Sequence, residues 1–208
     1  LSNQLGPQQA GQLASDRGRI EFDGHDVTRL PAHVRARRGL ARSFQITRLF
    51  RSASVLDNVA LAVLAVSPPA INGWRSLRRN GGVHARARQA LDDVDLGAKA
   101  SAPIDRLSHG ERRALEVAMT LASRPKLLLL DEPMAGMGPD ESARIERLVA
   151  SLRASTTVLL IEHDVDAVFR LADRVSVLVS GRVIATGTPA AVRSDAAVRA
   201  AYLGDEAA

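Results

Sequence analysis

The second half of the chain alternates between short apolar runs and amphipathic stretches, and this alternation constrains the fold more than any other feature. LLLLDEP over 127–133 is the clearest apolar run, and TTVLLIE over 156–162 is a second. Helical periodicity is predicted over 109–123, 139–154 and 164–172, before and after these runs. Uniformly apolar strands separated by helices are typical of a parallel sheet covered on both faces. The sequence therefore predicts an α/β fold.

Shorter elements are predicted in the rest of the chain. Alternating residues followed by a turn signal indicate a strand that enters a hairpin over 18–24. Pro near the start and Gly after the end favour a short helix over 30–39. Ser54 is the expected cap of a helix over 54–65. The other expected elements are a strand over 40–45, a helix over 84–96, two short strands around the SGR of 180–182 and a final helix over 189–202.

Composition excludes several classes of protein. A content of 46% hydrophobic and 25% charged residues is ordinary for a soluble globular chain. The chain has no cysteine, so neither a disulfide framework nor thiolate chemistry is proposed. The longest apolar run, 59–66, is much shorter than the roughly 20 residues of a membrane span. No secretory leader is recognised, and we expect no membrane crossing.

The net charge of +5 is carried largely by arginine, several of which lie between 35 and 51. A nucleic-acid surface is one interpretation of such a stretch. A solvated or partner-facing surface is the other. No aromatic residues alternate with these arginines as a stacking platform for bases requires, so we expect no nucleic-acid partner.

Two acids follow the first apolar run. Asp131 and Glu132 stand at the carboxyl end of the predicted strand, where ligands bind in parallel α/β sheets. In phosphoryl-transfer sites the first acid holds Mg²⁺, and an adjacent acid orients or deprotonates the attacking water. The alternative is that Asp-Glu-Pro only ends a strand and starts a turn.

Ser108 and Glu111 have the spacing of a capping box, which predicts that a helix begins there. With Gly110 beside them, the free backbone N–H groups of the first turn form a candidate anion site. The alternative is an ordinary capped helix.

Two further polar residues follow predicted strands. His163 comes directly after the second apolar run, where it can contact a phosphate. Gln45 follows LARSF, at the end of the strand predicted over 40–45, where it can bind metal or water. For each residue the alternative is a local structural role. A metal site made of Glu162, His163 and Asp164 is conceivable, but three neighbouring residues do not converge easily on one ion.

The order of these motifs resembles that of ATP-binding-cassette (ABC) ATPases, from about Gly18 to Gly204. The resemblance extends to AGMGPDE over 135–141, in the place of the D-loop, with Gly138 where many members have Asp. The resemblance implies that Gln45 is the glutamine-loop residue and that Leu107 to Glu111 is the signature motif, with His109 in place of its central glycine. It also implies that Asp131 and Glu132 are the Walker B acids and that His163 is the switch histidine.

This resemblance implies a P-loop NTPase-like parallel sheet core with a small helical subdomain. We expect a single ABC ATPase domain over 1–208, with 1–53 and 124–208 as the sheet-containing core. The helical subdomain with the signature motif would span 54–123. The usual helix after the phosphate loop is expected to be lacking.

The resemblance also implies an activity and its cofactors. ATP and Mg²⁺ are the expected ligands. Asp131 and Gln45 would hold the metal, Glu132 would act as the base, and His163 would contact the γ-phosphate. Ser108, Gly110 and Glu111 would contact nucleotide. All these motifs are expected to surround one shared triphosphate pocket.

Several quoted segments, among them RSFQITRLF, LSHGERR and AYLG, resemble the ATP-binding subunits of branched-chain amino-acid importers, with urea and amide importers closely similar. The implied partners are a second ABC ATPase subunit, integral-membrane permease subunits and, indirectly, a substrate-binding protein. The implied location is the cytoplasmic face of the inner or plasma membrane. DNA-associated relatives carry long heptad-repeat arms, and no sustained heptads occur here.

The opening stretch departs from the family pattern. Gly6 and Gly11 have the glycine frame of a phosphate loop, but Gln12 and Leu13 stand where Lys and Ser or Thr are needed. A strand is predicted too soon afterwards for a helix of ordinary length. A truncated or scrambled start, a degenerate partner within a heterodimer, and a chance match are three interpretations. A degenerate chain could still offer Ser108 and Gly110 to its partner's nucleotide. Because the lysine, the hydroxyl and the following helix are all expected to be missing, we predict weak or absent ATP binding by this chain alone.

Overall fold

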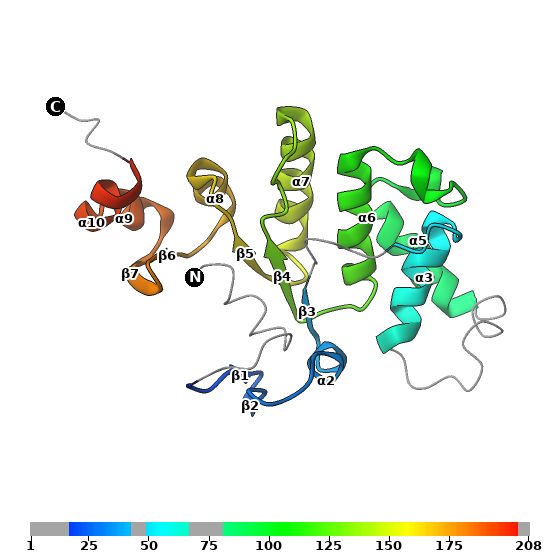
Figure 1. The fold of residues 1–208 in the computed structure, drawn as a ribbon, viewed down its shortest axis with the longest axis horizontal. Helices are drawn as coiled ribbons and strands as arrows, with labels where there is room; N and C mark the ends of the chain where they lie inside the picture. Colours follow the sequence, from blue (N-terminus) through cyan, green and yellow to red (C-terminus); the bar gives the residue numbers. More distant parts are fainter. Residues whose placement is uncertain (1–16, 43–48, 67–80, 204–208) are drawn as a thin grey trace.

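The computed structural model describes residues 17–42, 49–66 and 81–203. A three-stranded parallel sheet lies in the middle, with a group of helices on one side of it and a small C-terminal unit on the other (Figure 1). Gly6, Gly11 and Gln45 fall outside the described residues, as does the segment where the helix after the phosphate loop was expected to be lacking.

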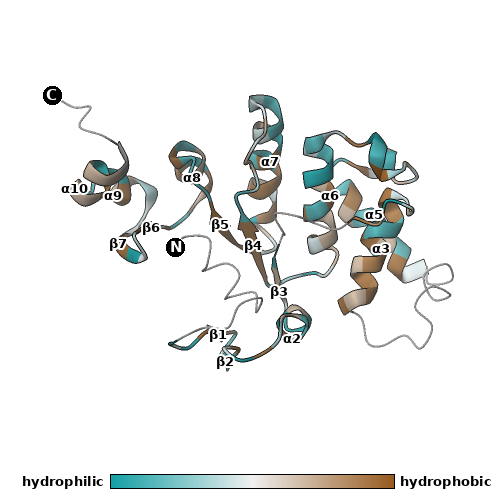
Figure 2. Ribbon diagram, viewed as in Figure 1, coloured by the Kyte–Doolittle hydropathy of each residue, from teal (hydrophilic) through white to brown (hydrophobic). Residues whose placement is uncertain are grey.

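The central sheet has the strand order β3 (Leu40–Arg42), β4 (Leu127–Asp131) and β5 (Thr157–Ile161), and both pairings are parallel. The helix α7 (Pro139–Leu152) connects β4 to β5. Residues 128–130 of β4 have no exposed surface, and the strand is among the most hydrophobic parts of the ribbon in Figure 2. The parallel sheet predicted from the apolar runs is therefore confirmed.

Coverage of the sheet differs from strand to strand. The central strand β4 is buried on both faces, because Leu129 is as inaccessible as its neighbours Leu128 and Leu130. The edge strand β5 exposes Thr157 and Leu159, and Leu159 is 38% exposed. The expectation of a sheet covered on both faces thus holds for β4 but not for β5, because Thr157 and Leu159 lie on the same face of β5 and are exposed. In the described sheet β5 is also an edge strand.

Three helices form the group beside the sheet. They are α3 (Val55–Val66), α5 (Gly81–Asp92) and α6 (His109–Leu121), and short 3₁₀ turns over Gly97–Lys99 and Ile104–Arg106 lead from α5 to α6. The Ser54 hydroxyl accepts the N–H of Asp57 at 3.1 Å, which confirms the predicted cap of α3. The buried residues of these helices form one continuous cluster with residues of β4 and α7. The helices and the sheet therefore share a core.

The remaining elements flank this core. A short hairpin and a helix precede β3, and an antiparallel pair near the C-terminus has a small core of its own around Val175, Val192 and Val198. These elements are β1 (Glu21–Phe22), β2 (His25–Asp26), α2 (Ala32–Arg37), α8 (Val165–Leu171), β6 (Val175–Val179) and β7 (Arg182–Gly187). No helix in the described part of the chain is both long enough and apolar enough to span a bilayer.

The prediction of one final helix is wrong. The structure has α9 (Pro189–Ser194), α10 (Ala196–Val198) and a π-helical turn over Arg199–Leu203. Asp195 interrupts the helix, because its backbone is extended and its carboxylate accepts the N–H groups of Ala197 and Val198. An aspartate that offers this bond favours a new helix start over continuation of the previous helix.

A pair of leucine substitutions tests this account of the core. Leu130→Ala is expected to lower the free energy of unfolding by about 2–5 kcal/mol, because it opens a cavity among fully buried residues. The matched change Leu159→Ala, on the exposed side of β5, is expected to cost about 1 kcal/mol or less. Urea denaturation measures both, and equal losses would contradict the assigned burial.

Candidate functional site

The acids and the histidine predicted from the sequence lie at the carboxyl end of the strands, which we call the sheet edge. Asp131 ends β4 and pairs in register with Ile161 of β5, and the N–H of Glu132 donates to the Ile161 carbonyl at 2.8 Å. His163 follows Ile161 by two residues, and its side chain is 73% exposed. The carboxyl ends of two adjacent parallel strands thus bring these three residues together, as expected.

A buried ion pair holds the first of these acids. Nη2 of Arg42, the last residue of β3, lies 2.7 Å from Oδ2 of Asp131, and the two side chains are 7% and 3% exposed. The second oxygen of Asp131, Oδ1, is buried and has no hydrogen-bond partner among the described residues. In the sequence Arg42 was one member of a basic stretch. The register of β3 beside β4 gives it this specific role.

The free oxygen of Asp131 bears on whether this edge suits Mg²⁺. Mg²⁺ is commonly held by one or two carboxylates, with substrate phosphates and water completing its shell. A buried carboxylate oxygen without a partner matches one such ligand, and Glu132 is the next residue. Gln45, the other expected ligand, lies outside the described residues. The described part of this edge therefore fits a metal that substrate completes, and not a cage made by protein alone.

Glu162 is a site residue that the sequence did not reveal. Its side chain is 1% exposed, and its two oxygens accept the N–H groups of Met134 at 3.0 Å and of His163 at 3.2 Å. Glu162 therefore ties the loop after the acid pair to the end of β5. No group of three or more potential metal ligands occurs within the described ranges, so a metal site made of Glu162, His163 and Asp164 is not proposed. A carboxylate at the end of an apolar strand was the available signal.

The loop after β4 also contains strained backbone. Glu132 has φ of 46°, in the left-handed region that residues other than glycine rarely adopt. Such strain persists only where the surroundings impose it, and it concentrates at functional sites. The bonds at Ile161 and Glu162 hold this loop from both sides. The position of Glu132 is therefore fixed by β5 and not by its own conformational preference.

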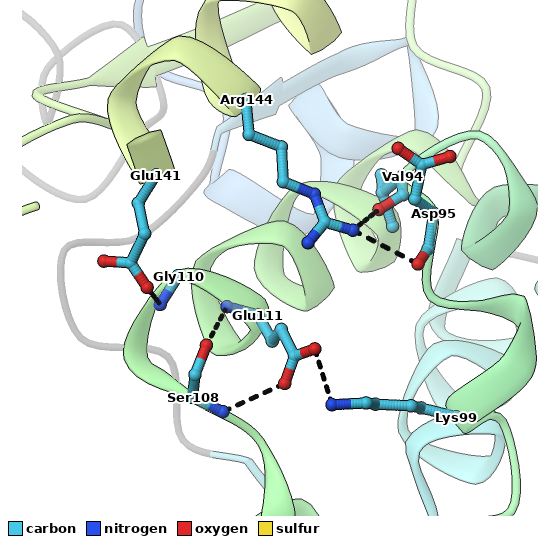
Figure 3. Close-up of polar contacts among 8 residues, drawn as sticks. All are labelled: Val94, Asp95, Lys99, Ser108, Gly110, Glu111, Glu141 and Arg144. Carbon is cyan, nitrogen blue, oxygen red and sulfur yellow. Dashed lines mark hydrogen bonds and ion pairs between the residues drawn. The ribbon is translucent and has the colours of Figure 1, made fainter. Parts of the chain in front are cut away.

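The predicted capping box is present at the start of α6. The Ser108 hydroxyl accepts the N–H of Glu111 at 3.2 Å, and the Glu111 carboxylate accepts the N–H of Ser108 at 3.0 Å (Figure 3). Lys99 donates to the other oxygen of Glu111 at 2.6 Å. The hydrogen bond from Lys99 is the main reason that the pKa of Glu111 lies below its ordinary value. This turn is thus closed by hydrogen bonds within the helical group.

Two residues of α7 reach across to the group of helices, one to this turn and one to the segment after α5. Glu141 accepts the N–H of Gly110 at 3.1 Å, and Arg144 donates to the carbonyl of Asp95 at 3.2 Å (Figure 3). Both come from the first turns of α7, three residues apart, so they lie on one face of that helix. Neither contact was predicted from the sequence, because each joins segments far apart in the chain.

The predicted site residues therefore fall into two groups. One group is the sheet edge, with Asp131, Glu132 and His163, and the other is the turn at the start of α6, with Ser108, Gly110 and Glu111. None of the hydrogen bonds found in the described ranges joins the groups directly, and Glu141 of α7 forms the contact between that helix and the turn. The expectation that all these motifs surround one shared pocket stays a prediction, since Gln45, Gly6 and Gly11 lie outside the described residues.

The buried pair offers a stability prediction. Arg42→Met is expected to lower the free energy of unfolding by about 3–5 kcal/mol, because it leaves the Asp131 charge buried without a partner. The double change Arg42→Met with Asp131→Leu removes both charges and is expected to cost less than the single change. Chemical denaturation, or recovery of folded protein where the single variant does not fold, measures this. A double variant as unstable as the sum of the singles would contradict the pair.

Glu111 offers a pH prediction. A carboxyl whose pKa is lowered on folding contributes stability above its unfolded pKa of about 4.3 and loses it as the pH falls through the folded value. Glu111→Gln is therefore expected to cost about 1 kcal/mol at pH 7 and progressively less in acid. Thermal unfolding across pH measures the difference. The account requires a smaller difference in a Lys99→Met background, and an unchanged one would contradict it.

Comparisons with known proteins agree with this architecture. The family model described as ABC transporter matches residues 9–135, and the model described as Branched-chain amino acid ATP-binding cassette transporter matches residues 182–208. The branched-chain amino acid transport ATP-binding protein BraF of Pseudomonas aeruginosa is 36% identical over 197 residues, covering 90% of this chain and 76% of BraF. The lipopolysaccharide export system ATP-binding protein LptB of Acidithiobacillus ferridurans is 37% identical over 213 residues, covering 97% and 84%.

Solved structures resemble the whole chain. The ADP conformation of MJ1267, an ATP-binding cassette of an ABC transporter, has a TM-score of 0.83 and 26% identity, covering 98% of this chain and 83% of that one. The two family models, the identity with BraF and LptB and this overall similarity lead to one assignment. The chain belongs to the ATP-binding, energy-coupling subunits of ABC transporters.

Proposed function

We propose that this chain serves an importer of branched-chain amino acids. The match of residues 182–208 to the branched-chain family model carries the proposal, and the similarity to BraF supports it. LptB, a lipopolysaccharide export system ATP-binding protein, has a similar percentage identity over a longer part of the chain. Overall sequence identity therefore does not distinguish between these two transported substrates. Urea and amide importers are the alternative among importers. The chain would act at the cytoplasmic face of the membrane through permease partners.

The residues at the sheet edge have distinct roles in the proposed ATP hydrolysis. Asp131 would hold Mg²⁺ through its free oxygen with Gln45 as a second ligand, and the metal when bound supplies charge neutralisation at the phosphates. Glu132, fixed by β5, would orient or deprotonate the attacking water. His163 has an exposed imidazole beside this edge, which suits a contact with the γ-phosphate.

The turn at the start of α6 has a different role. Ser108 and His109 are exposed, and neither bonds to the acid pair in the described structure. A nucleotide that needs both groups would then lie between two subunits, with the acids of one and the signature turn of the other. The division of the site residues into two groups supports a second ABC ATPase subunit as partner.

The phosphate loop is the part of the site that we propose to be defective. Gln12 and Leu13 offer neither the ammonium nor the hydroxyl that such loops use, and both lie outside the described residues. Loss of one preorganised donor costs roughly 10²–10³ in rate. The alternative function is accordingly a non-hydrolysing partner that completes the ATP site of another subunit.

Two separate substitutions distinguish these functions. In the reconstituted transporter, Ser108→Ala and Glu132→Gln are both expected to reduce ATP-driven leucine uptake at least tenfold if this chain hydrolyses ATP. Ser52→Ala, an exposed serine outside both groups, is the control and is expected to leave uptake unchanged. Loss with Ser108→Ala alone would indicate the non-hydrolysing partner. Normal uptake with both variants, or no leucine transport at all, would contradict the proposed function.

A further inference from the structure

The Glu141 side chain covers one face of Gly110. A methyl group built at position 110 would lie 2.6 Å from Oε1, 2.8 Å from Cδ and 3.1 Å from Cγ of Glu141. A side chain at position 110 would therefore require the end of the Glu141 side chain to shift. The close approach brings Oε1 within 3.1 Å of the Gly110 nitrogen, and the carboxylate accepts its N–H (Figure 3).

This N–H belongs to the first turn of α6, whose amides have no partner within the helix. The capping box uses the N–H of Glu111, and Glu141 uses that of Gly110. A phosphate that approaches Gly110 needs the same hydrogen as its acceptor bond. It also meets the negative charge of Glu141 at close range. Carboxylate and phosphate therefore exclude one another at this amide.

We propose that Glu141 is a built-in competitor of phosphate, which closes the signature turn in the free chain and leaves when a nucleotide phosphate arrives. This inference rests on the proposed function, which assigns Ser108 and Gly110 to a nucleotide held by a partner subunit. It adds a regulatory step that neither the motifs nor the relatives specify. Phosphate binding and the position of α7 become linked at one hydrogen bond.

The released carboxylate has a favourable position to occupy. Glu141 is the third residue of α7 after the Gly138 cap, and an acid in a first turn is stabilised by the helix dipole. Arg144 can keep its bond to the Asp95 carbonyl while Glu141 moves, because the two contacts are separate. On displacement, the carboxylate would lose the Gly110 N–H but remain in the first turn of α7, where the helix dipole stabilises it.

The consequence extends to the acid pair. Glu141 lies on the segment that begins at Glu132, and Glu162 holds that segment at Met134. Glu132, the residue proposed to activate water, therefore lies on the same short segment as Glu141, which contacts Gly110 by a hydrogen bond.

Titration of the chain with inorganic phosphate tests this competition. The amide resonance of Gly110 is followed by NMR in the unmodified chain, in Glu141→Gln and in Asp140→Asn. The control changes the same charge at an exposed neighbour in the same helical turn. Phosphate is expected to shift the Gly110 resonance with a dissociation constant at least about tenfold lower in Glu141→Gln than in the other two, since a charge-assisted competitor has been weakened.

Two results would overturn the proposal. One is an equal response of Gly110 in all three proteins, and the other is no response even in Glu141→Gln. Glu141→Ala, which removes the carboxylate entirely, must behave like Glu141→Gln, and thermal unfolding checks that each variant is folded. Failure here would leave the transport test with Ser108→Ala unaffected. Failure of that transport test would equally leave this titration interpretable.

Discussion

The charge of Asp131 is the constraint on which the arrangement of the site depends. A strand buried on both faces carries this carboxylate to its end, where water does not reach it freely. Burying an unpaired charge is strongly unfavourable, so a cation must accompany it. Arg42 supplies that cation from the neighbouring strand and satisfies one oxygen only. The other oxygen remains for a ligand, and the chemistry of the sheet edge follows from this half-satisfied pair.

Two other carboxylates, those of Glu162 and Glu141, hold the rest of the site by accepting backbone N–H groups. The Glu162 carboxylate holds the loop after the acids by accepting the N–H of Met134, and Glu141 extends from the next helix to the turn at Gly110. The segment from Glu132 to Glu141 therefore joins the sheet edge to the helix whose Glu141 contacts Gly110 at the start of α6. Under the proposed function, a nucleotide that contacts both groups lies between two such subunits.

Much of this architecture could be predicted from local pattern. The uniform hydrophobicity of 127–130 indicated a buried parallel strand, and the spacing of Ser108 and Glu111 indicated a capped helix start. The contacts of Arg42, Glu162 and Glu141 could not be predicted, because each joins residues whose proximity only strand register or helix packing creates. The break at Asp195 and the exposed side of β5 were missed for a related reason, since periodicity does not show which competing bond or neighbour prevails.

Calorimetric titration of MgATP into the purified chain tests the central claim most directly. Under the proposed function this chain contributes the acids and the turn at the start of α6, and its phosphate loop, with Gln12 and Leu13 in place of Lys and Ser or Thr, is proposed to be defective. We therefore predict a dissociation constant above about 1 mM for the chain alone, which corresponds to a binding free energy weaker than about −4 kcal/mol. A micromolar dissociation constant would contradict this prediction, because a complete nucleotide site would then reside within one subunit.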